Sequence, residues 1–113
     1  MEEYLRLEQE GADFNISNEF GVTPLMSVAK TGNIQLVRFL LKHIRNVNQE
    51  DKRGNTALYY AVEGGHLEVV QVLYEHGARI SDFIYMYSIT TKKRNIVHFF
   101  DKQDKNKQVF LKK

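Results

Sequence analysis

Apolar residues recur at helical spacing in two separate stretches of the chain. In both stretches they fall at positions i, i+3, i+6 and i+7, namely Ile34, Val37, Leu40 and Leu41, then Leu67, Val70, Leu73 and Tyr74. This spacing gathers the apolar side chains on one stripe of an α-helix. The pattern therefore predicts two amphipathic helices, over about 34–43 and about 67–76.

A shorter helix is predicted ahead of each of these two. Thr23 and Thr56 belong to the residue types that cap the N-terminus of a helix. Pro24 suits the first turn, because the N–H that it lacks would have no partner there. The first of these helices is expected to end near Gly32, so that each short helix is followed directly by a longer one.

The chain repeats itself at a constant spacing of 33 residues. The matched segments are Gly21-Val22-Thr23-Pro24-Leu25 with Gly54-Asn55-Thr56-Ala57-Leu58, Gly32-Asn33-Ile34 with Gly65-His66-Leu67 and, at twice the spacing, Glu10-Gly11-Ala12 with His76-Gly77-Ala78. A helix pair this short cannot bury its own apolar stripe, so neighbouring pairs must stack on one another.

A 33-residue period with G-x-T-P-L, a glycine in mid-repeat and a closing Gly-Ala resembles the ankyrin-repeat family. The resemblance covers about residues 1–82, and residues 83–101 in weaker form. It implies a mainly α-helical solenoid of stacked helix-turn-helix pairs with short β-hairpin fingers, here over 46–55 and 79–85. One departure is Ile44-Arg45 in place of the closing Gly-Ala. A β-branched residue disfavours positive φ, so the helix before it must end differently or run on slightly.

The resemblance divides the chain into a repeat domain, 1–102, and a basic tail, 103–113. The domain is expected to comprise a partial N-terminal cap, two repeats and a degenerate C-terminal cap, at 1–17, 18–50, 51–83 and 84–102. The chain then opens with the second helix of a repeat. The last repeat has a shortened finger, with helices expected over about 86–92 and 95–102.

Composition narrows the class of protein. The chain has 113 residues, 42% of them hydrophobic, and no cysteine, which excludes disulfides and thiol chemistry. It shows no apolar stretch of membrane-spanning length and no signal-peptide pattern, so we expect a cytoplasmic protein without a membrane partner. Residues 92–113 carry eight lysines and arginines against two aspartates, whereas the rest of the chain carries an excess of acidic residues. Such a basic tail is usually a solvated one.

The sequence offers little for catalysis. His43 and His76 are equivalent in the repeat, so we expect them about 10 Å apart in adjacent layers, too far to share a metal ion. His66 occupies a position that the family uses structurally, and no phosphate-binding glycine motif or activated serine is present. We therefore predict no cofactor, no metal site and no enzymatic activity.

The resemblance implies that a partner is bound by the finger tips and by the exposed sides of the first helices. Aromatic residues and arginine are the types enriched at interface hot spots. The candidate contact residues are Glu19, Phe20, Val22, Lys30, Lys52, Arg53, Asn55, Tyr60, Glu63 and Tyr85. Packing between repeats is the alternative for the tyrosines, above all for Tyr59 and Tyr87.

These observations predict a non-catalytic module, most simply a monomer, that binds another protein through its concave face. Within the same class, a bacterial immunity or antitoxin-like protein and a host-directed effector stay open. A nucleic-acid adaptor acting through the lysine-rich tail is the alternative from another class, although no platform of interleaved aromatic residues accompanies that tail.

Overall fold

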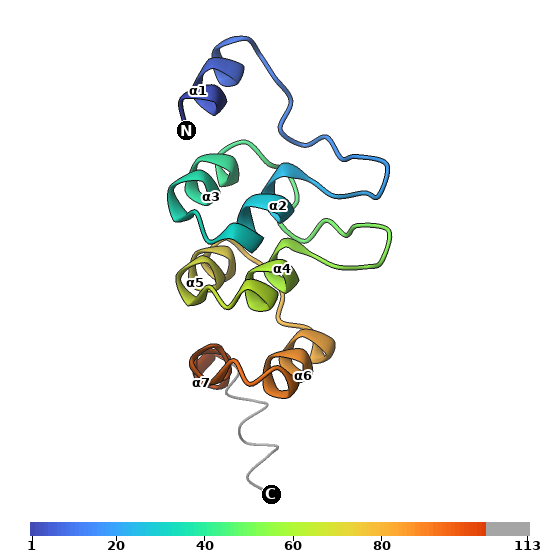
Figure 1. Ribbon diagram of the computed structural model, residues 1–113, viewed down its shortest axis with the longest axis vertical. Helices are drawn as coiled ribbons and strands as arrows, with labels where there is room; N and C mark the ends of the chain where they lie inside the picture. The colour runs from blue at the N-terminus through green and yellow to red at the C-terminus, as the bar shows by residue number, and fades with distance from the viewer. Residues whose placement is uncertain (104–113) are drawn as a thin grey trace, which may run out of the picture.

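The structure, a computed structural model, describes residues 1–103, which form short helices joined by loops (Figure 1). The helices are α1 (Glu2–Gln9), α2 (Pro24–Thr31), α3 (Ile34–Leu41), α4 (Ala57–Gly64), α5 (Leu67–Glu75), α6 (Asp82–Thr90) and α7 (Arg94–Gln103). The predicted helices over 34–43 and 67–76 are present as α3 and α5, which end two residues and one residue earlier than expected. No helix in this part of the chain is long and apolar enough to cross a membrane.

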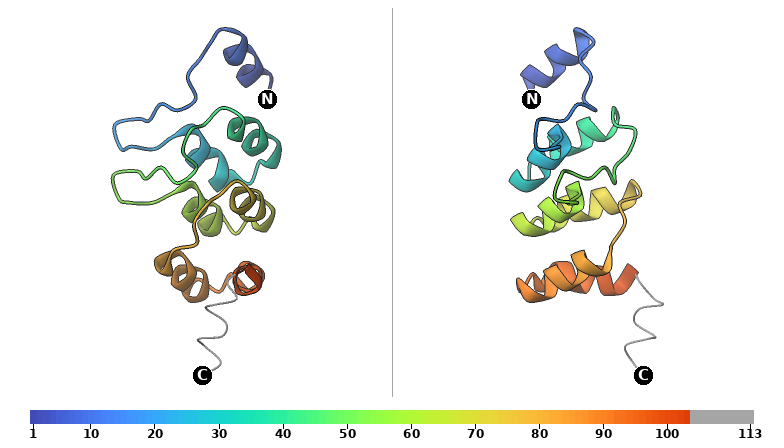
Figure 2. Two further views of the ribbon diagram at one scale, coloured as in Figure 1. Left: turned by 180° about the vertical axis from the view of Figure 1, so that it is seen from behind. Right: turned by 90° about the vertical axis from the view of Figure 1, so that its right-hand side faces the viewer.

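The helices form two columns (Figures 1 and 2). The helices α2, α4 and α6 make one column, here called the inner helices, and α1, α3, α5 and α7 make the other, the outer helices. Two long loops, before α2 and before α4, project beyond the inner helices. The helix α1 lies at one end of the stack and has no helix beside it in the inner column.

The inner helices begin where the sequence places their caps. The Thr23 hydroxyl accepts a hydrogen bond from the backbone N–H of Met26 at 3.2 Å, and Thr56 accepts one from Tyr59 at 3.4 Å. The Ser81 hydroxyl caps α6 in the same way, accepting from Ile84 at 3.1 Å. These side chains replace partners that the first N–H groups of a helix lack.

Gly32 ends α2 in a left-handed conformation, with φ at +81°. A Cβ atom at this residue would lie 2.5 Å from the ring of His66, so only glycine allows the two layers to approach this closely. The Nε2 atom of His66 lies 3.0 Å from the carbonyl oxygen of Lys30. His66 thus joins neighbouring repeats, which is the structural role implied by the family resemblance.

The loop after α3 differs from the loop after α5. Gly77 takes a left-handed conformation after α5, whereas Ile44 does not after α3. The helix α3 accordingly ends at Leu41, one residue earlier in the repeat than α5, which ends at Glu75. Of the two outcomes that Ile44 left open, the helix ends differently; it does not run on.

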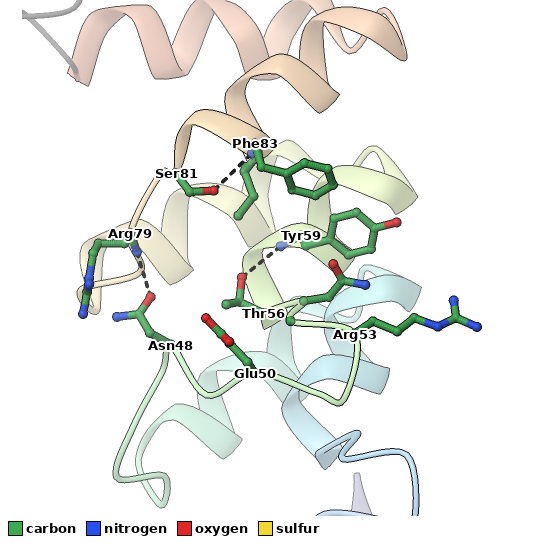
Figure 3. Close-up of a pocket in the computed structure, with 11 residues that line it drawn as sticks. Asn48, Glu50, Arg53, Thr56, Tyr59, Arg79, Ser81 and Phe83 are labelled. Carbon is green, nitrogen blue, oxygen red and sulfur yellow. Dashed lines mark hydrogen bonds between the residues drawn. The ribbon is translucent and has the colours of Figure 1, made fainter.

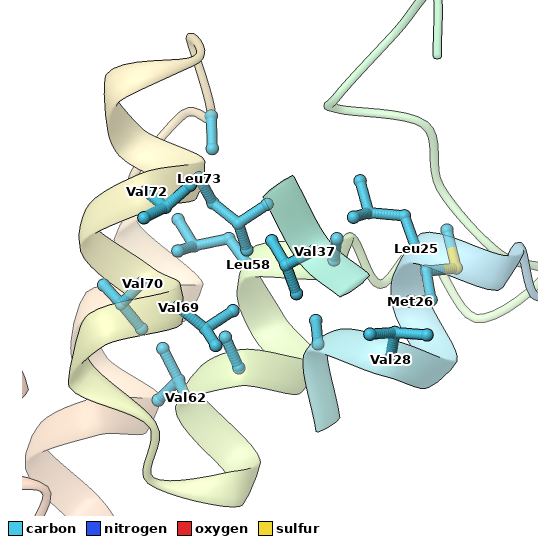
Figure 4. Close-up of a cluster of buried hydrophobic side chains, with 14 of the residues drawn as sticks. Leu25, Met26, Val28, Val37, Leu58, Val62, Val69, Val70, Val72 and Leu73 are labelled. Carbon is cyan, nitrogen blue, oxygen red and sulfur yellow. The ribbon is translucent and has the colours of Figure 1, made fainter. Parts of the chain in front are cut away.

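The core lies between the columns and runs through the stack (Figure 4). Leu40 and Leu73, from the two predicted apolar stripes, have no exposed surface. Figure 4 shows Val37, Leu58 and Leu73 meeting between α3, α4 and α5. Because each side chain fills space between two layers, a single pair of helices could not form this core.

Two expectations about the loops need correction. No strand occurs within residues 1–103, so the predicted β-hairpin fingers are loops built on turns. The finger expected over 79–85 is missing, because α6 starts at Asp82 instead of about Met86. Only the short connection 76–81 is left between α5 and α6. Residues 104–113, nearly all of the predicted basic tail, lie outside the described residues.

Candidate binding surface

The two projecting loops, residues 15–23 (the first finger) and 48–56 (the second finger), turn in the same way. The Oδ1 atom of Asn18 accepts hydrogen bonds from the backbone N–H groups of Phe20 and Val22, both at 2.9 Å. Asp51, at the equivalent position of the next repeat, accepts bonds at the same two offsets, also at 2.9 Å. One side-chain oxygen therefore fixes each turn locally, without a strand ladder.

The two fingers are joined at their tips. The backbone N–H of Lys52 donates to the carbonyl oxygen of Phe20 at 3.0 Å. Gly21 lies beside this bond with φ at +78°, and a Cβ atom there would come within 3.0 Å of the Lys52 nitrogen. Glycine thus lets the second finger lie directly against the first.

Asparagines tie the base of each finger to the next loop. Asn15 accepts from the backbone N–H of Arg45 at 2.8 Å and donates to the carbonyl oxygen of His43 at 3.0 Å. Asn48, its equivalent in the next repeat, accepts from the backbone N–H of Arg79 at 2.8 Å and donates to the carbonyl oxygen of Gly77 at 3.1 Å. Sequence reasoning missed both residues, although their spacing of one full repeat was the available signal.

Asp51 also connects the second finger to α4. Its carboxylate is buried and accepts a hydrogen bond from the Tyr60 hydroxyl. Burial by itself would raise the pKa of Asp51, but the bonds from Tyr60 and from the two finger amides outweigh it, so this pKa lies below its usual range. The same bond raises the pKa of the Tyr60 hydroxyl. Tyr60 therefore supports the finger instead of standing free on the surface.

The predicted contact residues differ in their exposure. Five are exposed, namely Glu19, Phe20, Lys30, Lys52 and Arg53, and four are half-buried, namely Val22, Asn55, Tyr60 and Glu63. Val22 packs against the core. Phe20 is 63% exposed, the largest exposed fraction among the large apolar side chains of the described residues.

Lys30 and Glu63 form an ion pair with each other. The Lys30 ammonium group lies 3.4 Å from a Glu63 carboxylate oxygen, and the Tyr59 hydroxyl donates to the other oxygen of the same carboxylate at 3.4 Å. This pair bridges α2 and α4 on the inner column. A partner that used either charge would first have to compete with this ion pair.

Tyr85 does not lie on the surface where the sequence predicted it. Its side chain is only 8% exposed, and its hydroxyl donates to the Asp101 carboxylate of α7. The expected position assumed that residues up to Tyr85 belong to a finger, whereas they form the first turns of α6. Tyr85 consequently faces the interior between α6 and α7.

Phe83 takes the surface position instead, and sequence reasoning missed it. It is 60% exposed and stacks on Tyr59 with ring centroids 6.0 Å apart. Tyr87 completes the cluster, 4.9 Å from Tyr59 and 6.0 Å from Phe83. The packing expected for Tyr59 and Tyr87 is therefore present. The cap residue Ser81 was the sequence signal that could have set the start of α6.

An open notch of about 400 Å³ lies between the second finger and the start of α6 (Figure 3). The finger contributes Asn48, Glu50, Arg53, Gly54, Asn55 and Thr56, and the opposite side is formed by Tyr59, Arg79, Ser81, Phe83 and Ile84. Figure 3 shows the Glu50 carboxylate turned into the notch, with the guanidinium groups of Arg53 and Arg79 directed outward at its two sides.

Within residues 1–103, no three histidine or acidic side chains lie close enough together to hold a metal ion. His43 lies 2.6 Å from Glu8 on α1, and its ring packs between Phe14 and Phe39 at 5.3 and 5.0 Å. His76 lies 2.9 Å from the backbone carbonyl of Val72, one turn earlier. Both histidines therefore make contacts that support a structural role.

Short helix pairs stacked in two columns, with projecting loops along one side, define a helical repeat solenoid. Residues 2–84 match the family model that describes ankyrin repeats in three copies. The match spans well over half of the chain, so this protein belongs to the ankyrin-repeat family.

Curated relatives are similar in sequence to segments of this chain. The chain is 49% identical over 51 residues to osteoclast-stimulating factor 1 of Gallus gallus. The matched segment covers 45% of this chain and 25% of that protein. It is 38% identical over 69 residues to protein fem-1 homolog A-like of Mus musculus, covering 61% of this chain and 11% of that protein. The chain thus spans a quarter or less of the length of these relatives.

Proposed function

We propose that this chain is a non-catalytic module that binds a protein partner through the two fingers and the exposed side of the inner helices. The observation that carries this proposal is the exposure of Phe20, an aromatic side chain at the tip of a tightly braced finger. Burial of such a side chain by a partner is favourable. Because the finger is already fixed by Asn18 and Lys52, little ordering is needed on binding.

The outer helices offer a poorer surface. The outward side of α3 and α5 carries basic, acidic and amide side chains, namely Gln35, Arg38, Lys42, Glu68, Gln71 and Glu75. Residues of these types are depleted or energetically weak at interface centres, arginine excepted. The contrast favours the finger side, which is also the face that family resemblance implies.

We extend the proposed surface along the inner column to Phe83. A typical stable interface covers about 800 Å² on each partner, and two fingers alone offer a small area. Phe83 and the notch beside it add aromatic surface continuous with the second finger. The proposal places the protein in the cytoplasm as a monomer, with residues 1–102 as its repeat domain.

Alanine substitutions test the face that is used. The partner is first captured from native lysate and identified by mass spectrometry, and its affinity is then measured by calorimetry. Phe20→Ala and Arg53→Ala should each weaken binding by more than about 1 kcal/mol, while the free energy of unfolding changes by less than about 0.5 kcal/mol. Arg38→Ala and Gln71→Ala are the controls and should change neither. Loss of binding in the controls alone would place the site on the outer helices.

The identity of that partner separates the narrower alternatives. A co-expressed toxin would support an immunity or antitoxin-like role, and a protein of a host cell would support an effector role. A nucleic-acid adaptor would instead show affinity that falls steeply with salt and is lost when residues 102–113 are deleted.

A further inference from the structure

The row of fingers stops after the second, and the connection 76–81 is too short to supply a third. The notch of about 400 Å³ occupies the space beside the second finger. The second finger lies against one side of the first finger, and the bond from the Lys52 amide to the Phe20 carbonyl oxygen joins them. The second finger therefore has an uncovered side that is shaped by this chain's own shortened repeat.

We propose that the notch binds an arginine or lysine side chain from an extended segment of the partner, lying where a third finger would otherwise lie. This site deepens the protein binding proposed above and rests on it. It assigns the chemistry of one contact: a cation held by Glu50 and by the rings of Tyr59 and Phe83.

The position of the Glu50 carboxylate favours a cation at the centre of the notch. The Glu50 carboxylate is exposed and turned into the notch (Figure 3), and no cationic side chain within residues 1–103 lies within 4.0 Å of it. Arg53 and Arg79 line the notch but direct their guanidinium groups outward. An incoming carboxylate at the centre would meet Glu50, whereas a guanidinium or ammonium group would form a charge-assisted hydrogen bond with it.

The aromatic side of the notch favours the same occupant. Tyr59 and Phe83 stack with an interplanar angle of 23°, and Phe83 is 60% exposed. The hydrogen bond from the Tyr59 hydroxyl to Glu63 holds the tyrosine ring in place. The exposed face of such a ring attracts a cation, and it also packs against the aliphatic part of an arginine or lysine side chain.

The backbone of the second finger suits an extended segment. The carbonyl oxygen of Phe20 accepts the amide of Lys52 from the next finger. The equivalent carbonyl of the second finger belongs to Arg53, and no backbone amide of residues 1–103 donates to it. An amide of the bound segment can make this bond, as peptides do when they add to an exposed backbone edge.

The test uses the full chain labelled with ¹⁵N and three short peptides. The probe is acetyl-Gly-Ser-Arg-Ser-Gly-amide; the matched peptides carry citrulline, which is neutral and similar in shape, or glutamate in the central position. The arginine peptide should shift the amide signals of Asn55 and Phe83. Its Kd should be at least about fivefold lower than that of the citrulline peptide, because only arginine forms the charge-assisted bond.

Variants locate the effect. Glu50→Gln should remove the preference for arginine, and Phe83→Ala should raise the Kd about threefold through loss of the ring contact. Glu68→Gln, the same charge change on the outward side of α5, should leave the Kd unchanged. Unchanged amide signals away from the substitution show that each variant is folded.

Several results would overturn the site. Equal binding of the citrulline peptide, an unaffected Glu50→Gln variant, or no shifts with any peptide at millimolar concentration would each exclude a cation site. Tighter binding of the glutamate peptide would show that Arg53 and Arg79 dominate. If Phe20→Ala still weakens partner binding in any of these cases, the notch is wrong while the proposed function stands.

Discussion

The two ends of the stack within residues 1–103 are built in different ways. At the C-terminal end, α6 and α7 form a helix pair, and Ile96 and Phe100 of α7 have no exposed surface. At the N-terminal end, α1 is a single helix without any buried residue. A helix pair encloses an interior between its members and the next layer, whereas a lone helix only covers side chains that other elements have gathered.

The contacts of α1 illustrate this covering role. Tyr4 lies against the rings of Phe14 and Phe39, with centroids 6.0 and 6.2 Å away. The His43 ring and the Glu8 carboxylate, 2.6 Å apart, add a polar link to the end of α3. We conclude that the C-terminal end supports the fold more strongly than the N-terminal end.

Truncation provides the largest test of this difference. Ending the chain after Ser81 removes α6 and α7 and exposes the apolar surface of α4 and α5, so the product should aggregate or lose cooperative unfolding. Deleting residues 1–10 should leave a chain that still unfolds cooperatively at a lower temperature. Thermal unfolding followed by circular dichroism and light scattering measures both. A shorter chain that melted as the full one does would show that α6 and α7 are not needed.

Single substitutions should also destabilise the chain more at the C-terminal end than at the N-terminal end. Phe100→Ala removes a fully buried ring and should lower the free energy of unfolding by about 3–5 kcal/mol, as such core changes do. Tyr4→Ala, at a half-buried residue of α1, should cost about 1–2 kcal/mol, because less surface is uncovered. Urea unfolding at one pH gives both values. Equal losses would mean that the two ends are equally important.

Lys92 offers a smaller effect at the C-terminal end. It has φ at +61° before α7, in the left-handed region that Gly32 and Gly65 occupy before α3 and α5. Because this conformation is unfavourable for a residue with a Cβ atom, Lys92→Gly should raise the free energy of unfolding by about 0.5–1 kcal/mol. Lys93→Gly is the neighbouring control and should not stabilise the chain. A loss of stability in Lys92→Gly would show that the lysine side chain contributes more than its backbone costs.

The smallest expected effect is a change in stability at acid pH, and it comes from Asp51 in the middle of the stack. The folded pKa of Asp51 is lower than its usual value, so its carboxylate contributes stability that is fully present above about pH 4 and is lost as the pH falls through the folded pKa. Asp51→Asn should therefore flatten the dependence of unfolding on pH below about pH 4. The turn itself should survive, because Asn18 makes the same bonds in the first finger. An unchanged acid profile in the variant would exclude Asp51 as its source.

The sequence by itself determined the helices of the two repeats that keep the full 33-residue spacing. The caps Thr23 and Thr56, the apolar stripes through Leu40 and Leu73, and the constant repeat spacing are local or periodic signals. Each specifies its element without knowledge of the partner layer, because capping and amphipathic spacing act within a single helix or turn. The helical class followed from them.

Tertiary structure decided what happens where the repeat is shortened. Once the short connection 76–81 replaces a finger, the repeat period no longer places α6, which starts instead after its own cap Ser81. That shift buries Tyr85 against Asp101 and brings Phe83 out beside Tyr59. It also opens the notch beside Glu50. No local pattern specifies these contacts, because each joins residues from different layers whose separation only the stack determines.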